Sequence, residues 1–316
     1  MAHPEVVQAL NKAFTGLGVD ERSLVDVLSK SHADHKSSFR KANPHMFVED
    51  ERSFEKWNED HIELLRNEFL RFKNAMVLCA MHPWERDARI IKQSLKEGPE
   101  AYHVIVEVAC TRTSEELLGA RKAYHSLFDL SVEEDVATHV QGCERKLLVA
   151  LVSAYRYEGS KLKQDAAKSD AKIITSIIKN DEEQKNPTEN DEVIRILSTR
   201  SKPHLKEVLN DYMETSNKSI FEDIDESNSL LKSAIECLCT PQTYFCKVLF
   251  DAKQADADQR TKTSLTRVVV TRADVDMDEI KEEYMKLYGV TLAEKIEESA
   301  NGNYKDFMLA LINKEK

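Results

Sequence analysis

Apolar residues along this chain recur every three or four positions, with charged and polar residues between them. The run Phe69, Phe72, Met76, Val77 is typical, and it predicts a helix because residues at this spacing share one helical face. No stretch alternates apolar and polar residues over the length of a strand. The pattern therefore predicts a protein built from short helices.

The same arrangement of segments occurs several times along the chain. An apolar run rich in β-branched residues is followed by a short polar motif, and then by a charged helix that carries a tyrosine. The three clear copies of the motif are Thr111–Thr113, Thr199–Ser201 and Thr271–Ala273, and the tyrosines are Tyr124, Tyr212 and Tyr284. With a weaker copy at Ser29–Ser31, the sequence predicts four imperfect repeats of about 70–80 residues.

Composition narrows the fold class. The chain has only eight Gly and seven Pro among 316 residues, whereas about 7% Gly and 5% Pro are usual. Folds rich in strands need more turns than these residues supply. No glycine-rich phosphate loop or dinucleotide-binding motif is present in the sequence, which argues against most nucleotide-binding enzymes.

Charge and cysteine usage narrow the function. The chain has 45 basic and 56 acidic residues and a net charge of −11. This charge predicts that the chain does not bind nucleic acid. It also predicts that anionic lipid repels the chain unless a cation lies between them. Six cysteines occur without a basic and apolar leader segment. We therefore expect a cytoplasmic protein with reduced thiols.

Two of the eight glycines lie close together in the segment Phe14–Glu21. Glycine permits backbone conformations in which carbonyl oxygens converge. Converging carbonyls with one carboxylate suit Ca²⁺, which takes 6–8 oxygen ligands. A plain turn between two helices explains the same glycines, so the segment alone leaves both interpretations open.

The four repeats together with this loop resemble the annexin family, in particular its plant members. Further motifs that carry the resemblance are Pro83–Ala88, Leu118–Tyr124 and Gly302–Asp306. The resemblance implies an all-α fold of four annexin repeats, each of five short helices, arranged as a curved disc. The implied repeats are residues 1–82, 83–154, 166–241 and 242–314, with a linker at 155–165.

The resemblance also implies a Ca²⁺ site in the first repeat. Matched to the family pattern, Phe14, Gly16 and Gly18 supply carbonyls and Glu68 supplies the carboxylate. Val19 and Glu21 are candidates for a minor neighbouring site, and Leu17 at the loop tip is the candidate membrane contact.

The sequence departs from the family pattern at several positions. Arg71 stands where a glycine is usual after the acid, and Val19 where a threonine is usual. An acidic insertion near residues 43–60 lengthens the segment between Gly18 and Glu68. The corresponding loops of the other three repeats lack the paired glycines.

We therefore expect a non-enzymatic protein that binds acidic phospholipid membranes through Ca²⁺. By resemblance, it is cytoplasmic, becomes peripheral on membranes when Ca²⁺ rises, and serves plant stress or calcium signalling. Actin, suggested by the tripeptide Ile194–Ile196, or other annexins are further candidate partners, and Cys110 and Cys239 are candidates for redox chemistry. No motif supports peroxidase or nucleotide hydrolase activity. The alternative is a helical scaffold that binds proteins or actin and whose Ca²⁺ sites have largely decayed.

Overall fold

The computed structural model describes residues 4–49, 55–153, 155–179, 186–254 and 257–314. Contacts divide the chain into two compact units. Unit 1 combines residues 1–80 with residues 245–316, and unit 2 is the continuous segment 81–244. The first and last repeats thus belong to one unit and the two middle repeats to the other.

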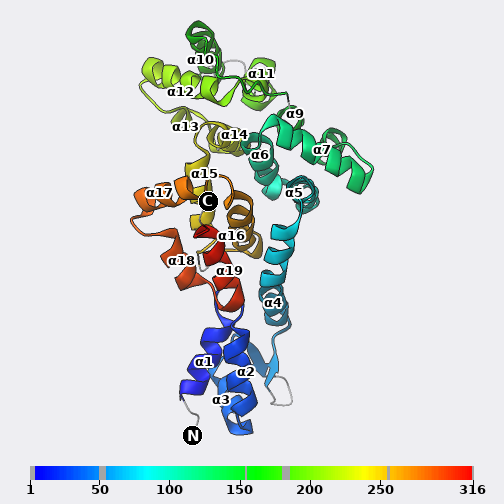
Figure 1. Ribbon diagram of the computed structural model, residues 1–316, viewed down its shortest axis with the longest axis vertical. Coiled ribbons are helices and arrows are strands. Elements are labelled where there is room, and N and C mark those ends of the chain that lie inside the picture. The colour runs from blue at the N-terminus through cyan, green and yellow to red at the C-terminus, as the bar shows by residue number, and fades with distance from the viewer. Residues whose placement is uncertain (1–3, 50–54, 154, 180–185, 255–256, 315–316) are drawn as a thin grey trace. The chain divides into compact units, whose positions relative to one another are not determined.

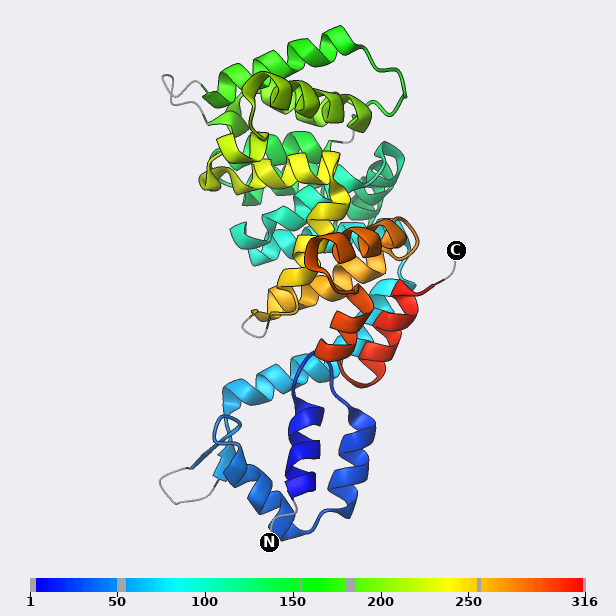
Figure 2. The same cartoon turned by 90° about the vertical axis from the view of Figure 1, so that its left-hand side faces the viewer.

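Unit 1 contains helices from the start and from the end of the chain, and a small hairpin. Its helices are α1 (Pro4–Phe14), α2 (Glu21–Lys30), α3 (Ala33–Ala42), α4 (Glu59–Ala80), α16 (Gln259–Arg272), α17 (Met277–Tyr288), α18 (Leu292–Ser299) and α19 (Gly302–Ile312), with most of α15 (Pro241–Asp251). Figures 1 and 2 show α1, α2 and α3 gathered in one bundle. Its core includes Leu10, Leu24 and Phe39.

The hairpin of unit 1 was not predicted. Strands β1 (Phe47–Glu49) and β2 (Glu55–Trp57) pair antiparallel, with Phe47 opposite Trp57. Their ring centroids lie 4.2 Å apart, and both residues pack on the α1–α3 core. Strands of three residues are too short to show an alternating pattern, and aromatic packing across the pair holds them together.

The described residues of unit 2 form α-helices and short 3₁₀ segments. The α-helices are α5 (Pro83–Glu97), α6 (Tyr102–Thr111), α7 (Ser114–Phe128), α8 (Val132–His139), α9 (Glu144–Val152), α10 (Gln164–Lys179), α11 (Asp191–Thr199), α12 (Lys202–Ser216), α13 (Ile220–Asp223) and α14 (Ser229–Cys239). The 3₁₀ segments are η1 (Pro99–Ala101), η3 (Pro187–Glu189) and η4 (Glu226–Asn228). Helix α6 packs on α14 and is buried along nearly its whole length.

The repeats show the same turn after the tyrosine helix. Helices α7, α12 and α17 end at Asp129, Asn217 and Gly289, each of which has the left-handed conformation that stops a helix. The next helices begin at the N-caps Ser131, Ser219 and Thr291, whose side chains accept backbone N–H groups. The repeated sequence pattern is therefore a repeated structure.

The all-α prediction is confirmed, with one departure in the first repeat. Within the described residues, the second, third and fourth repeats each contain five α-helices, and the first contains four. There, α4 runs unbroken over 22 residues because neither a glycine nor a proline interrupts Glu59–Ala80. The polar segment after residue 155 becomes helical at Gln164, the first residue of α10.

Candidate functional site

The glycine loop joins α1 to α2 and depends on both of its glycines. Gly16 has φ +94° and Gly18 has φ +77°, a region that other residues rarely adopt. A Cβ at Gly16 would lie 2.8 Å from the carbonyl oxygen of Ser299, and one at Gly18 would lie 2.8 Å from the Cβ of Tyr304. The glycines therefore serve the loop conformation and its close approach to the end of α18 and the start of α19.

Backbone hydrogen bonds attach this loop to the turn between α18 and α19. The Leu17 N–H donates to the Ser299 carbonyl at 2.8 Å, and the Asn301 N–H donates to the Leu17 carbonyl at 2.8 Å. The Asn301 side chain donates to the Thr15 carbonyl. Leu17 is only 3% exposed, so in this conformation it offers no side chain to a membrane, contrary to its predicted place at an exposed tip.

The loop carbonyls differ in how they are used. The carbonyls of Ala13, Thr15 and Leu17 accept hydrogen bonds from Asp20, the Asn301 side chain and the Asn301 backbone. Within the described part of the chain, no hydrogen bond reaches the carbonyls of Phe14, Gly16 and Gly18. The three carbonyls predicted as ligands therefore have capacity left for a cation.

Glu68 lies on α4 against this loop. Its Oε2 accepts the Gly18 N–H at 2.7 Å, although 50 residues separate the two in sequence. The residue is 7% exposed. The structure thus brings Glu68 to the loop that the sequence paired it with, and the acidic insertion between them does not prevent the contact.

Arg71 forms a buried ion pair with Glu68 one helical turn away. Its Nε donates to Glu68 Oε2 at 2.6 Å and its Nη2 to Oε1 at 2.7 Å. The Gln259 side chain donates to Glu68 Oε1 at 3.2 Å and accepts from Arg71 Nη2 at 2.9 Å. Arg71 also lies over the ring of buried Tyr304, 5.8 Å from its centroid.

This environment keeps Glu68 ionised. Burial alone would raise the pKa of its carboxyl group, but the hydrogen bonds and charge of Arg71 outweigh burial and lower the pKa below its usual value. The Gly18 N–H and Gln259 act in the same direction. The pKa of Arg71 is raised, since the attraction of Glu68 outweighs the effect of burial.

Gln259 and Asn301 are the contacts that sequence reasoning missed. Gln259 begins α16, directly after the degenerate loop of the fourth repeat, and Asn301 stands between α18 and α19. Both are more than 180 residues from their partners in the first repeat. No spacing rule within one repeat connects them, so only the three-dimensional structure reveals the contacts.

The residues fit a cation site of the low-charge kind. Within the described residues, no three His, Cys, Asp or Glu side chains gather in a way that would hold a metal ion. A site here would depend on carbonyl oxygens and the single carboxylate of Glu68, a donor set that suits a hard cation such as Ca²⁺. The minor candidate site, Val19 and Glu21, lies against the start of α19. A Cβ built on Gly302 would lie 2.3 Å from the Val19 carbonyl oxygen and 3.2 Å from a Glu21 carboxylate oxygen, so both oxygens lie near the same point.

The two candidate redox cysteines are buried thiols of unit 2. Cys110 is fully buried in the last turn of the apolar helix α6, and Cys239 ends α14 with 4% exposure. Burial raises the pKa of Cys110 to about 11 and that of Cys239 to about 12. Both are free and protonated at neutral pH, and thiolate is the reactive form.

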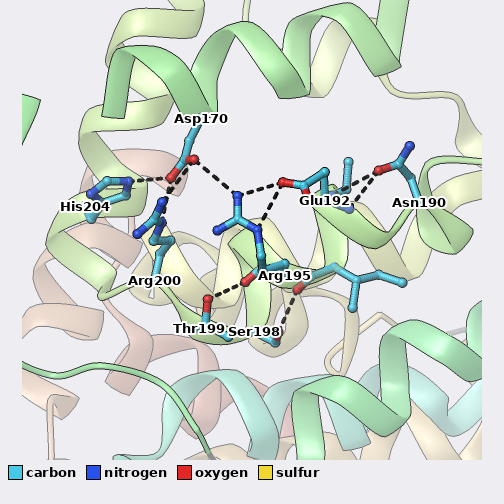
Figure 3. Close-up of polar contacts among 10 residues, drawn as sticks. Asp170, Asn190, Glu192, Arg195, Ser198, Thr199, Arg200 and His204 are labelled. Atoms are coloured by element: carbon cyan, nitrogen blue, oxygen red, sulfur yellow. Dashed lines mark hydrogen bonds and ion pairs between the residues drawn. The ribbon is translucent and has the colours of Figure 1, made fainter. Parts of the chain in front are cut away.

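The tripeptide considered for actin binding lies in α11. Ile194 and Ile196 are buried, at 7% and 0% exposure. Arg195 between them bonds to Glu192 at 2.8 Å and approaches Asp170 at 3.6 Å (Figure 3). These contacts explain the three residues through packing and ion pairing within the fold.

Comparisons with known proteins agree with this fold. The annexin family model matches residues 86–151, 176–229 and 251–311. Annexin D4 of Arabidopsis thaliana is 53% identical over 320 residues, which cover 99% of each chain. Annexin-like protein RJ4 of Fragaria ananassa is 36% identical over 318 residues, 98% of this chain and 96% of its own.

Solved annexin structures resemble the whole chain. Chicken annexin V aligns with a TM-score of 0.67 and 25% identity, covering 99% of this chain and 98% of its own. A point mutant of annexin A8 with an intact N-terminus aligns with a TM-score of 0.67 and 27% identity, covering 98% of this chain and 94% of its own.

The chain belongs to the annexin family. The predicted resemblance to plant annexins is confirmed by the 53% identity to annexin D4 of Arabidopsis thaliana. Membership in the family supports Ca²⁺ as the ligand and Ca²⁺-dependent binding of acidic phospholipid in general. Among the described residues, no helix is both long enough and apolar enough to cross a membrane.

Proposed function

We propose that this chain binds acidic phospholipid membranes through a Ca²⁺ ion held at the first repeat. The proposed ligands are the carbonyls of Phe14, Gly16 and Gly18 and the carboxylate of Glu68. The observation that carries the proposal is the 2.7 Å hydrogen bond from the Gly18 N–H to Glu68. It brings the only acid of the site to the loop whose alternate carbonyls have no hydrogen-bond partner in the described part of the chain.

The charge of the chain explains why a cation is needed. A net charge of −11 opposes approach to an acidic surface. A bound Ca²⁺ supplies positive charge and open coordination positions that lipid phosphate oxygens fill. With one carboxylate among neutral carbonyls, we expect a dissociation constant without lipid of about 10⁻⁴ M or weaker. Lipid and cation then strengthen each other's binding by linkage.

The experiment is cosedimentation with phosphatidylserine vesicles over a series of Ca²⁺ concentrations. Glu68→Gln is expected to raise the Ca²⁺ concentration for half-maximal binding roughly tenfold, because ligand charge sets affinity. Glu63→Gln is the matched control, since Glu63 also pairs with an arginine three residues later on α4 but is exposed. An unchanged Ca²⁺ requirement in Glu68→Gln would place the bridge elsewhere.

A second candidate function is the scaffold without working Ca²⁺ sites. The observation that favours it is Arg71, which already neutralises Glu68. The same vesicle experiment separates the two functions. Membrane binding without any dependence on Ca²⁺, or no membrane binding at all, would favour the scaffold.

The proposed setting is calcium signalling or the stress response of a plant cell. A weak site fills only when Ca²⁺ rises, so the chain would move to membranes at that time. We propose no catalytic step in this role.

A further inference from the structure

Both carboxylate oxygens of Glu68 accept hydrogen bonds from several donors in this structure. Oε2 accepts the Gly18 N–H and Arg71 Nε. Oε1 accepts Arg71 Nη2 and the Gln259 side chain. A carboxylate has about four acceptor positions, so this one has none left for a metal ion. At least one donor has to leave before the carboxylate becomes a ligand.

Electrostatics identifies the donor that leaves. The Gly18 N–H and the Gln259 amide are neutral, whereas the Arg71 guanidinium carries a full positive charge against the same two oxygens. A second cation beside a buried guanidinium meets like-charge repulsion at a few ångströms, in an environment that screens charge poorly. The pair is therefore exclusive: the carboxylate faces either Arg71 or a bound cation.

Arg71 has other contacts that hold it in place. Its Nη2 donates to Gln259 Oε1 at 2.9 Å, and its guanidinium carbon lies 5.8 Å from the centroid of the Tyr304 ring. Only 4% of its side chain is exposed. The guanidinium is thus positioned by three neighbours, which favours the state that excludes the metal ion.

We propose that Arg71 is a built-in competitor for Ca²⁺ at Glu68 and sets the Ca²⁺ concentration at which the first repeat engages a membrane. This inference rests on the proposed function of the loop. When the competent state is only fractionally populated, the apparent dissociation constant rises by the inverse of that fraction. Because Arg71 and Glu68 lie three residues apart on α4, the exchange needs only a rotation of the Arg71 side chain and no rearrangement of helices.

The same helix supplies a matched control. Arg66 pairs with Glu63 at the same i,i+3 spacing on α4, but the two side chains are 66% and 65% exposed. Arg71→Gln removes the charge and keeps a polar side chain of moderate length, and Arg66→Gln makes the same chemical change at a solvated site. Any effect of net charge alone is common to both variants.

The first test measures Ca²⁺ binding directly by calorimetry, on the full chain without vesicles. Arg71→Gln is expected to bind Ca²⁺ about tenfold more tightly than the wild type, and Arg66→Gln to bind as the wild type does. The vesicle cosedimentation midpoint is expected to shift to lower Ca²⁺ by a similar factor. Equal affinity of Arg71→Gln and wild type overturns the competitor role.

Two further variants keep the test decisive. Arg71→Lys retains the charge but loses the paired hydrogen bonds, so it is expected to give an intermediate affinity. If Arg71→Gln does not fold, an Arg71→Lys affinity equal to wild type overturns the proposal. If Glu68→Gln weakens binding while Arg71→Gln leaves it unchanged, the proposed site stands and only the competitor fails. If neither variant changes it, the site itself is wrong.

Discussion

Buried pairs of an arginine and a carboxylate occur in both compact units, but they join different parts of the chain. In unit 2, Arg112 at the end of α6 forms two hydrogen bonds to Asp87 on α5, at 2.7 and 2.8 Å. Arg200 after α11 is only partly buried and binds the buried carboxylate of Asp170 on α10. In unit 1, Arg71 and Glu68 belong to the same helix.

We infer that the arginine–carboxylate pairs of unit 2 stabilise the fold, whereas the Glu68–Arg71 pair of unit 1 controls a ligand site. The unit 2 pairs fix one helix against another, so their removal leaves a buried charge and loosens packing. The pair on α4 lies within one helix and reaches α16 through Gln259. Its carboxylate faces a loop whose carbonyls at Phe14, Gly16 and Gly18 accept no hydrogen bond from the described residues. We therefore expect stability effects in unit 2 and ligand effects in unit 1.

The fourth repeat has no aspartate at the position that Asp87 occupies in the second repeat. Phe245 is the fifth residue of α15, the position that Asp87 occupies in α5. Arg272 lies over the Phe245 ring at 4.8 Å and bonds to Asp276 at 2.7 Å. The face of the Phe245 ring and the carboxylate of Asp276 therefore take the place of the aspartate that α5 supplies in the second repeat.

The largest expected effect comes from Asp87→Ala. Arg112 is 7% exposed and would keep its charge without its partner, which costs about 3–5 kcal/mol of unfolding free energy. Urea unfolding followed by circular dichroism measures the loss. Asp26→Ala, which removes an exposed partner of Lys30, is the control and should cost under about 1 kcal/mol. Similar losses in the two variants would contradict the comparison.

Asp170→Asn should have the next largest effect and a distinct pH dependence. Burial alone would raise the pKa of Asp170, but Arg200 and His204 outweigh it and hold the pKa below the usual 3.8 (Figure 3). The ionised form is therefore the stabilising one. Its contribution is present above about pH 3.8 and is lost as pH falls through the lower folded value.

We expect Asp170→Asn to lower the unfolding free energy by about 2 kcal/mol at pH 7, with the difference from wild type shrinking below pH 3.8. Urea midpoints at pH 7 and pH 3 measure it. A constant difference at both pH values would show that the charge of Asp170 is not what stabilises the repeat.

Arg71→Gln should cost less stability than the unit 2 variants. Glu68 keeps the Gly18 N–H and the Gln259 amide as donors, so the expected loss is about 1–2 kcal/mol. Thermal unfolding in a chelator measures it without metal. A loss as large as that of Asp87→Ala would mean that this pair also holds the fold.

The smallest effect concerns Lys253 in the fourth repeat. Tyr124 and Tyr212 each donate to an aspartate eleven residues later, Asp135 and Asp223. The residue eleven after Tyr284 is Lys295. Burial, and secondarily the charge of Lys295, lower the pKa of Lys253 from 10.5 to about 8.

In the unfolded chain, Lys253 binds more protons than in the folded one between pH 8 and 10.5. The contribution of Lys253 to the unfolding free energy should therefore rise with pH over this range, by about 1 kcal/mol after allowance for partial exposure, while buried thiols such as Cys110 and Cys239 contribute in the opposite direction. Lys295→Asp introduces the carboxylate found in the second and third repeats and should reduce this rise, because burial of Lys253 remains. Unfolding at pH 7.5 and 9.5 compares the two, and an unchanged slope would exclude Lys295 as a cause.

The repeats were predictable because each one carries its own signals. The tyrosine helix, the left-handed stop at Asp129 or Asn217 and the following cap lie within a few residues of one another. Helical periodicity also predicted α4, but not that it runs without a break from Glu59. The local patterns thus predicted where helices occur, but they did not predict how long each helix is.

The candidate site was only partly predictable. The glycine loop is visible in the sequence, Glu68 follows from the resemblance to the family pattern, and the structure joins them. The role of Arg71 was visible only as a departure from the family, because its partner depends on a side-chain rotamer. The burial of Leu17 was missed because the turn that covers it comes from Ser299 and Asn301, far along the chain.

The backbone hydrogen bond between Leu17 and Ser299 also constrains the order in which parts of the chain fold during synthesis. Unit 2 is continuous, whereas unit 1 needs both residues 1–80 and residues 245–316. At a synthesis rate of about 5–20 residues per second, the glycine loop waits on the order of ten seconds or more for its partner turn. Unit 2 has time to fold first. A nascent chain that stops before α18 carries both glycines and Glu68 without the turn that fixes them, so the candidate site is among the last parts to be completed.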